Sequence, residues 1–229
     1  MGSRTALVVL VSAIVGCAET RPPATATDPR ADRVRASLEA LAAAKGYRAV
    51  RRVARAGRET VLHDLVLAPD YVHSTTEGNP AAETFARGTR VAKRSSSGRG
   101  WLVEEVPSAA GGAPGRGASG ARADVDALLR WAGPDASFAA PRAEDGCDVV
   151  EFSLDGDALA RVARAQGGSV DGARRLTVSV WIGADGLPRR ARQVYEGTSP
   201  REVVVEFSDV GIDSDPDLPG AVRRLLELP

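Results

Sequence analysis

Two histidines, His63 and His73, are the residues with the most obvious capacity for chemistry. They lie ten residues apart on strands expected on either side of a turn at Pro69, so they could meet in space as a pair of metal ligands. A protein zinc site needs three or four ligands, and two are too few without carboxylates such as Asp64. We therefore favour two surface or edge-strand histidines and predict no metal site.

Other motifs are incomplete. Asp213, Asp215 and Asp217 alternate as in the first half of a calcium loop, but the Gly at the turn and the distal Glu are absent, which favours a solvated acidic loop. The serines at 95–97 lack the G-x-S-x-G elbow of a nucleophile, and GGAPGRG at 111–117 lacks the Lys and the preceding strand of a phosphate loop. We predict a protein that is not an enzyme and uses no cofactor. An envelope hydrolase would need Ser, His and Asp together in one pocket.

The first 17 residues have the parts of a secretory signal. Arg4 is followed by an apolar run over 5–15, which is shorter than the roughly 20 residues that span a bilayer. Small residues then precede Cys17, which resembles the bacterial lipobox, in which the cysteine is diacylated and begins the mature chain. A plain cleaved signal with a coincidental cysteine is the alternative. We expect a signal peptide at 1–16 and lipidation of Cys17.

Residues 17–27 are rich in Pro and Thr and have no apolar periodicity, which is typical of a flexible tether. Two acyl chains would hold the protein firmly on a membrane, because each buried CH₂ contributes about 0.8 kcal/mol. Ala18 rather than Asp follows the cysteine, which favours the outer membrane if the host has one. With Cys17 acylated, Cys147 has no disulfide partner, and we interpret it as a small strand residue.

Composition indicates one globular domain with an appended tail. The 229 residues are 43% hydrophobic and 26% charged with net charge zero, and only 4% are aromatic, so Val, Leu and Ala must build the core. Basic residues are scattered arginines rather than one basic face, which argues against a nucleic-acid partner.

Periodicity predicts an α+β domain over 28–229. Asp28-Pro29 is typical of a helix start, and Val34, Leu38 and Leu41 form an apolar stripe that ends before Gly46. Short strands are expected at 47–56, 60–67, 70–76, 82–86, 89–94 and 100–105. The Gly-rich stretch 108–121 predicts a flexible loop inside the domain. A short helix near 125–131, a strand at 147–154, a helix at 157–166 and a last helical turn or two at 220–228 complete the pattern.

Residues 174–209 predict three antiparallel strands in a meander. Leu176, Val178, Val180 and Ile182 alternate with polar residues and Trp181, as in a sheet with one face toward a core. Asp185-Gly186 supplies the tight turn. Trp181 falls on the opposite, wetter face, where it either packs or contacts a partner.

The order of these elements resembles the LolA/LolB-like lipoprotein-carrier superfamily, and within it the LppX/LprG-type lipoproteins. The most specific residues are 180–189, VWIGADGLPR, which are similar to that family's strand, Asp-Gly turn and Leu-Pro-Arg. Residues 207–211, followed by Pro216 or Pro219, resemble its closing strand. The likeness covers most of residues 30–220.

The resemblance implies a strongly curved antiparallel β-sheet, a half-barrel of about ten strands that wraps a few helices. It also implies that a lipid or a lipoprotein acyl chain binds in an apolar cavity between sheet and helices. The candidate cavity residues are Leu65, Leu67, Leu128, Val150, Phe152, Leu154, Val178, Val180, Ile182 and Val205. The same apolar face would serve a dry core equally well, and the scarcity of aromatic residues leaves room for a collapsed cavity. The alternative function is a structural or assembly lipoprotein whose sheet contacts another envelope protein.

Overall fold

The computed structural model describes residues 28–94, 100–105, 120–165 and 172–227. The expected signal, the tether, the serines at 95–97 and most of the Gly-rich loop lie outside these ranges. In the described part the helices are α1 (Pro29–Ala43), α2 (Ala121–Trp131), α3 (Gly156–Ala165) and α4 (Gly220–Leu225). The strands are β1 (Gly46–Arg55), β2 (Arg58–Leu67), β3 (Tyr71–Thr76), β4 (Asn79–Arg87), β5 (Arg90–Arg94), β6 (Trp101–Glu105), β7 (Ser137–Phe138), β8 (Arg142–Glu144), β9 (Cys147–Asp155), β10 (Ala173–Ile182), β11 (Pro188–Gly197) and β12 (Arg201–Ser208).

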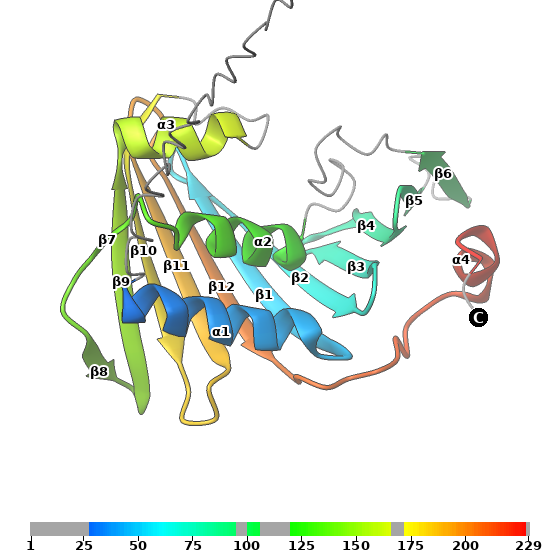
Figure 1. The fold of residues 1–229 in the computed structure, drawn as a ribbon. Coiled ribbons are helices and arrows are strands. Elements are labelled where there is room, and N and C mark those ends of the chain that lie inside the picture. Colours follow the sequence, from blue (N-terminus) through cyan, green and yellow to red (C-terminus); the bar gives the residue numbers. More distant parts are fainter. Residues whose placement is uncertain (1–27, 95–99, 106–119, 166–171, 228–229) are drawn as a thin grey trace, which may run out of the picture.

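All twelve described strands belong to one curved antiparallel sheet that does not close into a barrel (Figure 1). Its order is β6-β5-β4-β3-β2-β1-β12-β11-β10-β9-β7, with β8 paired to β9 outside this path. The long β1–β12 ladder joins the first half of the chain to the meander, with Ala49 opposite Phe207 and Val53 opposite Val203. The α+β class and the curved antiparallel sheet are therefore as predicted.

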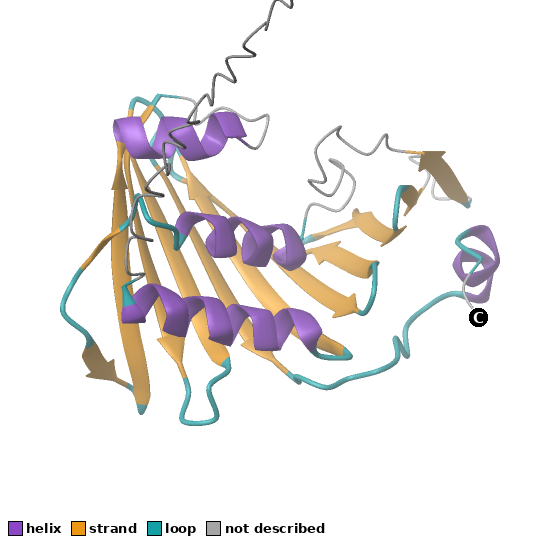
Figure 2. Ribbon diagram, viewed as in Figure 1, coloured by secondary structure: helices purple, strands orange, loops and turns teal. Residues whose placement is uncertain are grey.

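Helices α1 and α2 lie side by side across one face of the sheet, which we call the inner face (Figure 2). Helix α1 begins where Asp28 accepts a hydrogen bond from the backbone N–H of Arg30 at 2.9 Å, a common N-cap arrangement. Its buried stripe is Val34, Leu38 and Leu41, as predicted. The Arg30 guanidinium also donates to the carbonyls of Phe138 and Ala139, which ties the start of α1 to the β7 edge.

The opposite, outer face carries a second and smaller core at the β2–β6 end. After β12 the chain crosses this face as a strap, residues 209–227, that ends in α4 beside β6 (Figure 1). Val222 and Leu226 of the strap are fully buried against Tyr71, Phe85 and Ala92. This end of the sheet is therefore covered on its outer face by the strap.

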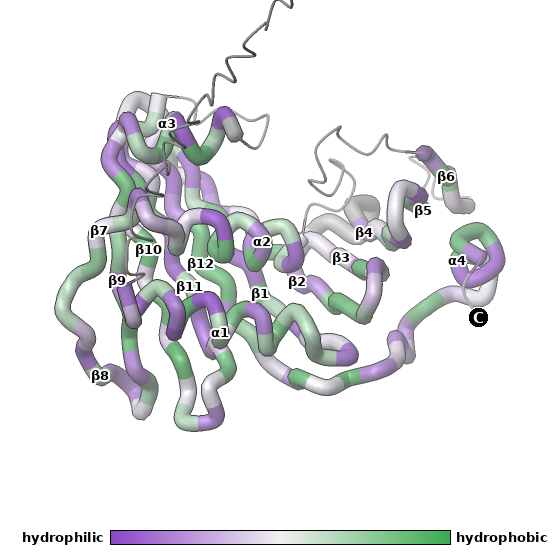
Figure 3. Tube along the Cα trace, viewed as in Figure 1, coloured by the Kyte–Doolittle hydropathy of each residue, from purple (hydrophilic) through white to green (hydrophobic). Residues whose placement is uncertain are grey.

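The sequence located nearly every long element. The helix at α1, the six strands β1–β6, strand β9, helix α3 and the meander β10–β12 are confirmed within two residues, apart from the start of β4 at Asn79, which is three residues earlier than expected. The two short strands β7 and β8 were not predicted. The loop expected over 108–121 ends earlier, because Ala121 already begins α2 and is fully buried. Hydrophobic positions recur along the strands beneath α1 and α2, as the meander pattern requires (Figure 3).

Replacing Leu38 by Ala tests the inner core. Leu38 is 0% exposed in the centre of α1, so Leu38→Ala should lower the free energy of unfolding by about 2–5 kcal/mol, the usual cost of a cavity in a packed core. Leu225→Ala is the matched control, since Leu225 is 37% exposed and its loss should change stability by no more than about 0.5 kcal/mol. Urea denaturation followed by circular dichroism measures both; equal effects would contradict the packing described.

Candidate functional site

The space between the helices and the inner face holds most of the predicted cavity residues. Eight of the ten lie in one apolar cluster and are each at most 2% exposed: Leu128, Val150, Phe152, Leu154, Val178, Val180, Ile182 and Val205. Leu128 comes from α2, and the other seven come from β9, β10 and β12. The register aligns Phe152, Val178, Gln193 and Val203 across four neighbouring strands, so this lining is continuous.

The remaining two, Leu65 and Leu67, do not line this space. On β2, Val66 belongs to the inner cluster, and alternation places its neighbours on the outer face, where Leu67 packs against the second core. The prediction that Leu65 and Leu67 share a cavity with the meander residues is therefore wrong. Strand β2 carries apolar residues on its inner and on its outer face, because both faces are covered.

Described residues line one small hollow in the inner space. A cavity of about 40 Å³ lies where the end of α1 and the start of α2 meet β1 and β2, lined by residues that include Tyr47, Val66 and Val125. Ligand pockets usually measure about 300–1,000 Å³. Two larger hollows, of about 550 and 290 Å³, lie elsewhere and are lined in part by charged residues such as Arg190 and Arg87.

A buried carboxylate fixes helix α2 over the sheet. Asp64 of β2 has a fully buried side chain, and it accepts hydrogen bonds from the backbone N–H of Ala121 at 2.8 Å and from the Ser74 hydroxyl at 2.5 Å. Gly120 precedes the helix and has no side chain to cap it, so Asp64 caps α2 from a neighbouring strand. A carboxylate at a helix N-terminus also interacts favourably with the helix dipole.

A second carboxylate in this region, Asp124 of α2, is half-buried beside Arg51. The pKa of Asp124 is raised to about 6, because burial and the charge of Asp64 raise it by more than the Arg51 guanidinium, 3.5 Å away, lowers it. Arg51 lies between the two carboxylates, 4.0 Å from Asp64. These three residues form a polar cluster at the edge of an otherwise apolar interior.

Two further polar groups lie inside the space without partners. Gln193 of β11 is 1% exposed, and its Oε1 accepts a hydrogen bond from the Tyr195 hydroxyl at 3.3 Å. Its Nε2 and the hydroxyl of Ser37 on α1 have no hydrogen-bond partner among the described residues. A buried donor left unsatisfied costs about 1–3 kcal/mol, so such groups usually have a partner, which is often an ordered water.

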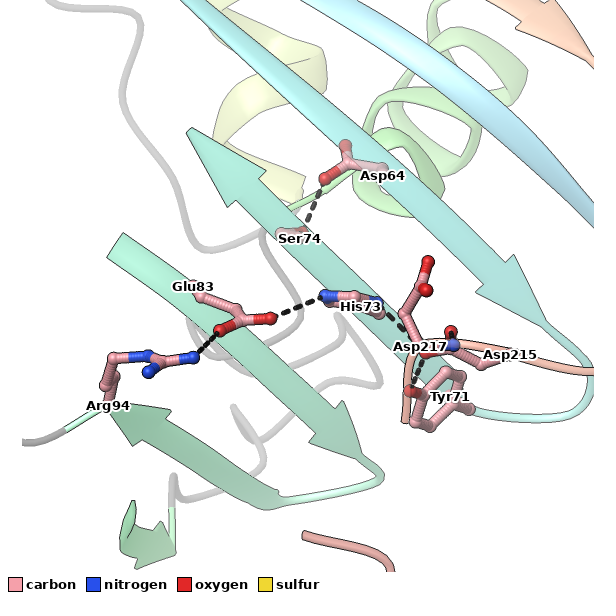
Figure 4. Close-up of polar contacts among 8 residues, drawn as sticks. All are labelled: Asp64, Tyr71, His73, Ser74, Glu83, Arg94, Asp215 and Asp217. Carbon is pink, nitrogen blue, oxygen red and sulfur yellow. Dashed lines mark hydrogen bonds and ion pairs between the residues drawn. The ribbon is translucent and has the colours of Figure 1, made fainter. Parts of the chain in front are cut away.

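The outer face holds a separate polar cluster around His73 (Figure 4). His73 Nδ1 lies 2.9 Å from the Asp215 carboxylate, and its Nε2 lies 3.4 Å from Glu83. The Tyr71 hydroxyl also donates to Asp215 at 2.5 Å, and Arg94 pairs with Glu83 at 2.6 Å. Asp215 belongs to the strap, so these bonds attach the strap to β3.

This cluster corrects two predictions. His63 is exposed as expected, whereas His73 is buried and stacks on the Phe85 ring with centroids 4.0 Å apart. Asp215, expected in a solvated loop, is also buried. The serine next to His73, Ser74, points to the inner face and donates to Asp64, so this pair is not a nucleophile and its base. Among the described residues there is no group of three or more His, Cys, Asp or Glu that could hold a metal ion.

Trp181 lies on the outer face as predicted, but it is buried rather than wet. Its ring lies beneath the Arg190 guanidinium at 3.9 Å and near that of Arg142 at 5.9 Å, an arrangement that stabilises both partners. Cys147 is a free, half-buried cysteine at the start of β9. Cys17 lies outside the described residues. No described helix has the length and hydropathy to span a membrane.

Comparisons with known proteins give structural neighbours only. No protein-family model and no curated protein matches the chain. The solved structures similar to it include LprF from Mycobacterium bovis, with 14% identity, 84% of this chain and 98% of that chain covered, and a TM-score of 0.46. LppX from Mycobacterium tuberculosis has 13% identity, coverage of 83% and 100%, and a TM-score of 0.49. A LolA superfamily protein from Nitrosomonas europaea has 12% identity, coverage of 85% and 96%, and a TM-score of 0.33.

These neighbours belong to the group that the sequence resembles. At such identities a likeness concerns the fold alone, and TM-scores below 0.5 do not support an argument about function. The functional argument therefore depends on this chain's own contacts.

Removing the carboxylate of Asp64 tests the cap on α2. Asp64→Ala leaves the Ala121 N–H and the Ser74 hydroxyl buried without an acceptor, and each should lower the free energy of unfolding by about 1–3 kcal/mol. Asp64→Asn keeps an acceptor and should lose less. Asp148→Ala is the control, because the exposed pair of Asp148 with Arg33 should contribute at most about 1 kcal/mol. Equal losses for Asp64→Ala and Asp148→Ala in urea denaturation would exclude the cap.

The pH dependence of stability tests the strap. Burial raises the pKa of Asp215, but the hydrogen bonds from His73 and Tyr71 lower it more, so its pKa lies below the ordinary 3.8. A lowered folded pKa contributes stability that is present above the unfolded value and is lost as the pH falls through the folded value. Wild type should therefore be more stable than Asp215→Asn at pH 7, and the difference should shrink below about pH 4. Urea denaturation at several pH values measures it; a difference that stays constant from pH 7 to pH 3 would contradict the contacts between Asp215 and the strands.

Proposed function

We propose that this protein is an envelope lipoprotein, anchored through a lipidated Cys17, that binds or carries a lipid or a lipoprotein acyl chain between the inner face and helices α1 and α2. The observation that carries the proposal is the apolar lining contributed by β9, β10 and β12, at most 2% exposed at residues such as Phe152, Val178 and Val205. Each buried CH₂ of an acyl chain would contribute about 0.8 kcal/mol, so one long chain suffices for useful affinity.

Binding requires that the cover moves. The hollow of about 40 Å³ that described residues line beneath α1 and α2 is far below the usual ligand-pocket size, so a bound acyl chain would need more room there. The first turn of helix α2 is held by polar contacts, namely Asp64 with the Ala121 N–H, Arg51 with Asp124 and Arg122 with the Pro69 carbonyl, and the rest of the helix is held by apolar packing. Apolar contacts are not directional, so an acyl chain could replace those that α2 makes with the sheet.

The unpartnered polar groups support the same site. The Gln193 amide and the Ser37 hydroxyl lie within the interior, where a bound ester or head group would find hydrogen-bonding partners. A ligand carbonyl at Gln193 Nε2 would satisfy a donor that now has none among the described residues.

A second candidate function uses the same fold without cargo. The packed interior favours a structural or assembly lipoprotein, because a dry core of this kind needs no ligand. In that case the protein would act through a surface that contacts another envelope protein.

Mass spectrometry of the full chain, purified gently from membranes, separates the two functions. We expect a native mass that exceeds the denatured mass by one lipid, since a non-covalent ligand is lost on denaturation whereas the anchor at Cys17 stays. Cys17→Ser should remove only the covalent increment. Equal native and denatured masses from a lipid-rich source would exclude the carrier.

A diazirine-bearing fatty acid locates the bound chain. After irradiation, labelled peptides should come from β10 and from α1 or α2, and Val178→Trp should reduce labelling by filling the inner space. Thr177→Trp, one residue away on the outer face, is the matched control. Labelling that is confined to outer-face peptides would contradict the proposed site.

A further inference from the structure

Three arginines lie side by side on the inner face, at the shared end of β1, β2 and β12. Arg55 of β1 is directly opposite Arg58 of β2 on one side and Arg201 of β12 on the other. Alternation along β1 places Arg55 on the same face as Tyr47 and Ala49 of the inner cluster. All three arginines are exposed, and opposite residues on neighbouring strands have Cβ atoms about 4.5–5.5 Å apart. We call these three residues the arginine row.

The charge of the arginine row is not neutralised by the part of the chain that the structure describes. None of its three members forms an ion pair with a described carboxylate. Arg201 lies over the Tyr195 ring, 3.9 Å from its centroid. The charge of Arg201 also acts on Asp124, but the ion pair of Asp124 is with Arg51. Like charges directly opposite each other are destabilising, so a bound anion would stabilise the row.

Arginines on the outer face of the same region are paired, in contrast to the row. Arg52 of β1 pairs with Glu206 at 2.8 Å, and Arg192 of β11 pairs with Glu202 at 2.6 Å. Glu59 of β2 also faces outward, where its charge acts on Arg52. These outer carboxylates are therefore already matched to outer arginines, and the sheet lies between them and the row.

The arginine row directly borders the apolar interior. The next inward-facing residues along β1 and β12 are Val53 and Val203, which lie opposite each other and pack in the inner cluster. Tyr195, opposite Arg201 on β11, is 4% exposed and belongs to the same cluster. Two residues along a strand span about 7 Å. Three cations thus lie one such step from an apolar lining, as an anionic head group joined to an acyl chain requires.

We infer that the arginine row binds the anionic phosphate of a lipid head group whose acyl chain lies between the inner face and the helices. The inference rests on the proposed carrier function and adds the class of ligand, an anionic lipid. Guanidinium groups suit a phosphate, because each can donate two parallel hydrogen bonds to its oxygens. Free inorganic phosphate has the same chemistry but cannot use the neighbouring apolar lining.

Competition between two lipids tests the inference. The full chain in mild detergent is offered equal amounts of phosphatidylglycerol and phosphatidylcholine with identical acyl chains, and native mass spectrometry measures the ratio bound. Wild type should bind several-fold more phosphatidylglycerol, which is anionic, than phosphatidylcholine, which is zwitterionic. Arg55→Gln should lower this ratio, Arg55→Gln with Arg58→Gln should bring it close to one, and Arg55→Lys should retain most of it. Arg224→Gln, which removes an exposed arginine of α4, is the matched control and should leave the ratio unchanged.

The same experiment separates failure of the inference from failure of the carrier function. Equal uptake of both lipids by wild type, with no change in the double variant, would overturn the inference and leave the carrier. Uptake of neither lipid would overturn both. Inorganic phosphate at the concentration of the lipids should not displace phosphatidylglycerol; displacement would identify free phosphate as the ligand and overturn the lipid head group. Circular dichroism checks that each variant is folded.

Discussion

The structure depends on covering one apolar face of an open sheet. The inner face of β9–β12 cannot remain in water, and α1 and α2 cover it with helix stripes that are themselves fully buried. Apolar packing alone does not determine where along the sheet a helix begins. Asp64 fixes the position where α2 begins, because its carboxylate accepts a hydrogen bond from the first backbone N–H of α2 and another from the Ser74 hydroxyl. A directional polar contact thus positions a non-directional apolar cover.

The two faces of the sheet have different chemistry. Inside, the polar groups are few and lie either at the start of α2 or, like Gln193, alone within apolar surroundings. Outside, His73 lies between the carboxylates of Asp215 and Glu83, and its contacts join strands β3 and β4 to the strap. The inner face is therefore suited to an apolar ligand, whereas the polar cluster on the outer face joins the strap to β3 and β4.

Local periodicity accounts for what the sequence could predict. Val178 and Val180 alternate with polar residues, so the inner face of β10 was evident from the sequence. The orientation of strand β2 could not be predicted, because both of its faces are covered and both contain apolar residues. The inner-facing residues include Asp64, which is polar, so the outer-facing residues such as Leu65 were assigned to the inner core instead. The strap was also hidden, because the contact of Tyr71 with Asp215 joins residues 144 positions apart and an Asp-rich segment resembles a solvated loop. Strands β7 and β8 are too short to show the alternation of apolar and polar residues that identifies a strand.

The strap also makes the outer core depend on residues 209–227. Tyr71 and Phe85 are covered by Val222 and Leu226, so a chain without these residues would expose an aromatic surface of β3 and β4 to water. Large exposed apolar surfaces favour aggregation, so loss of the strap would lower solubility as well as stability.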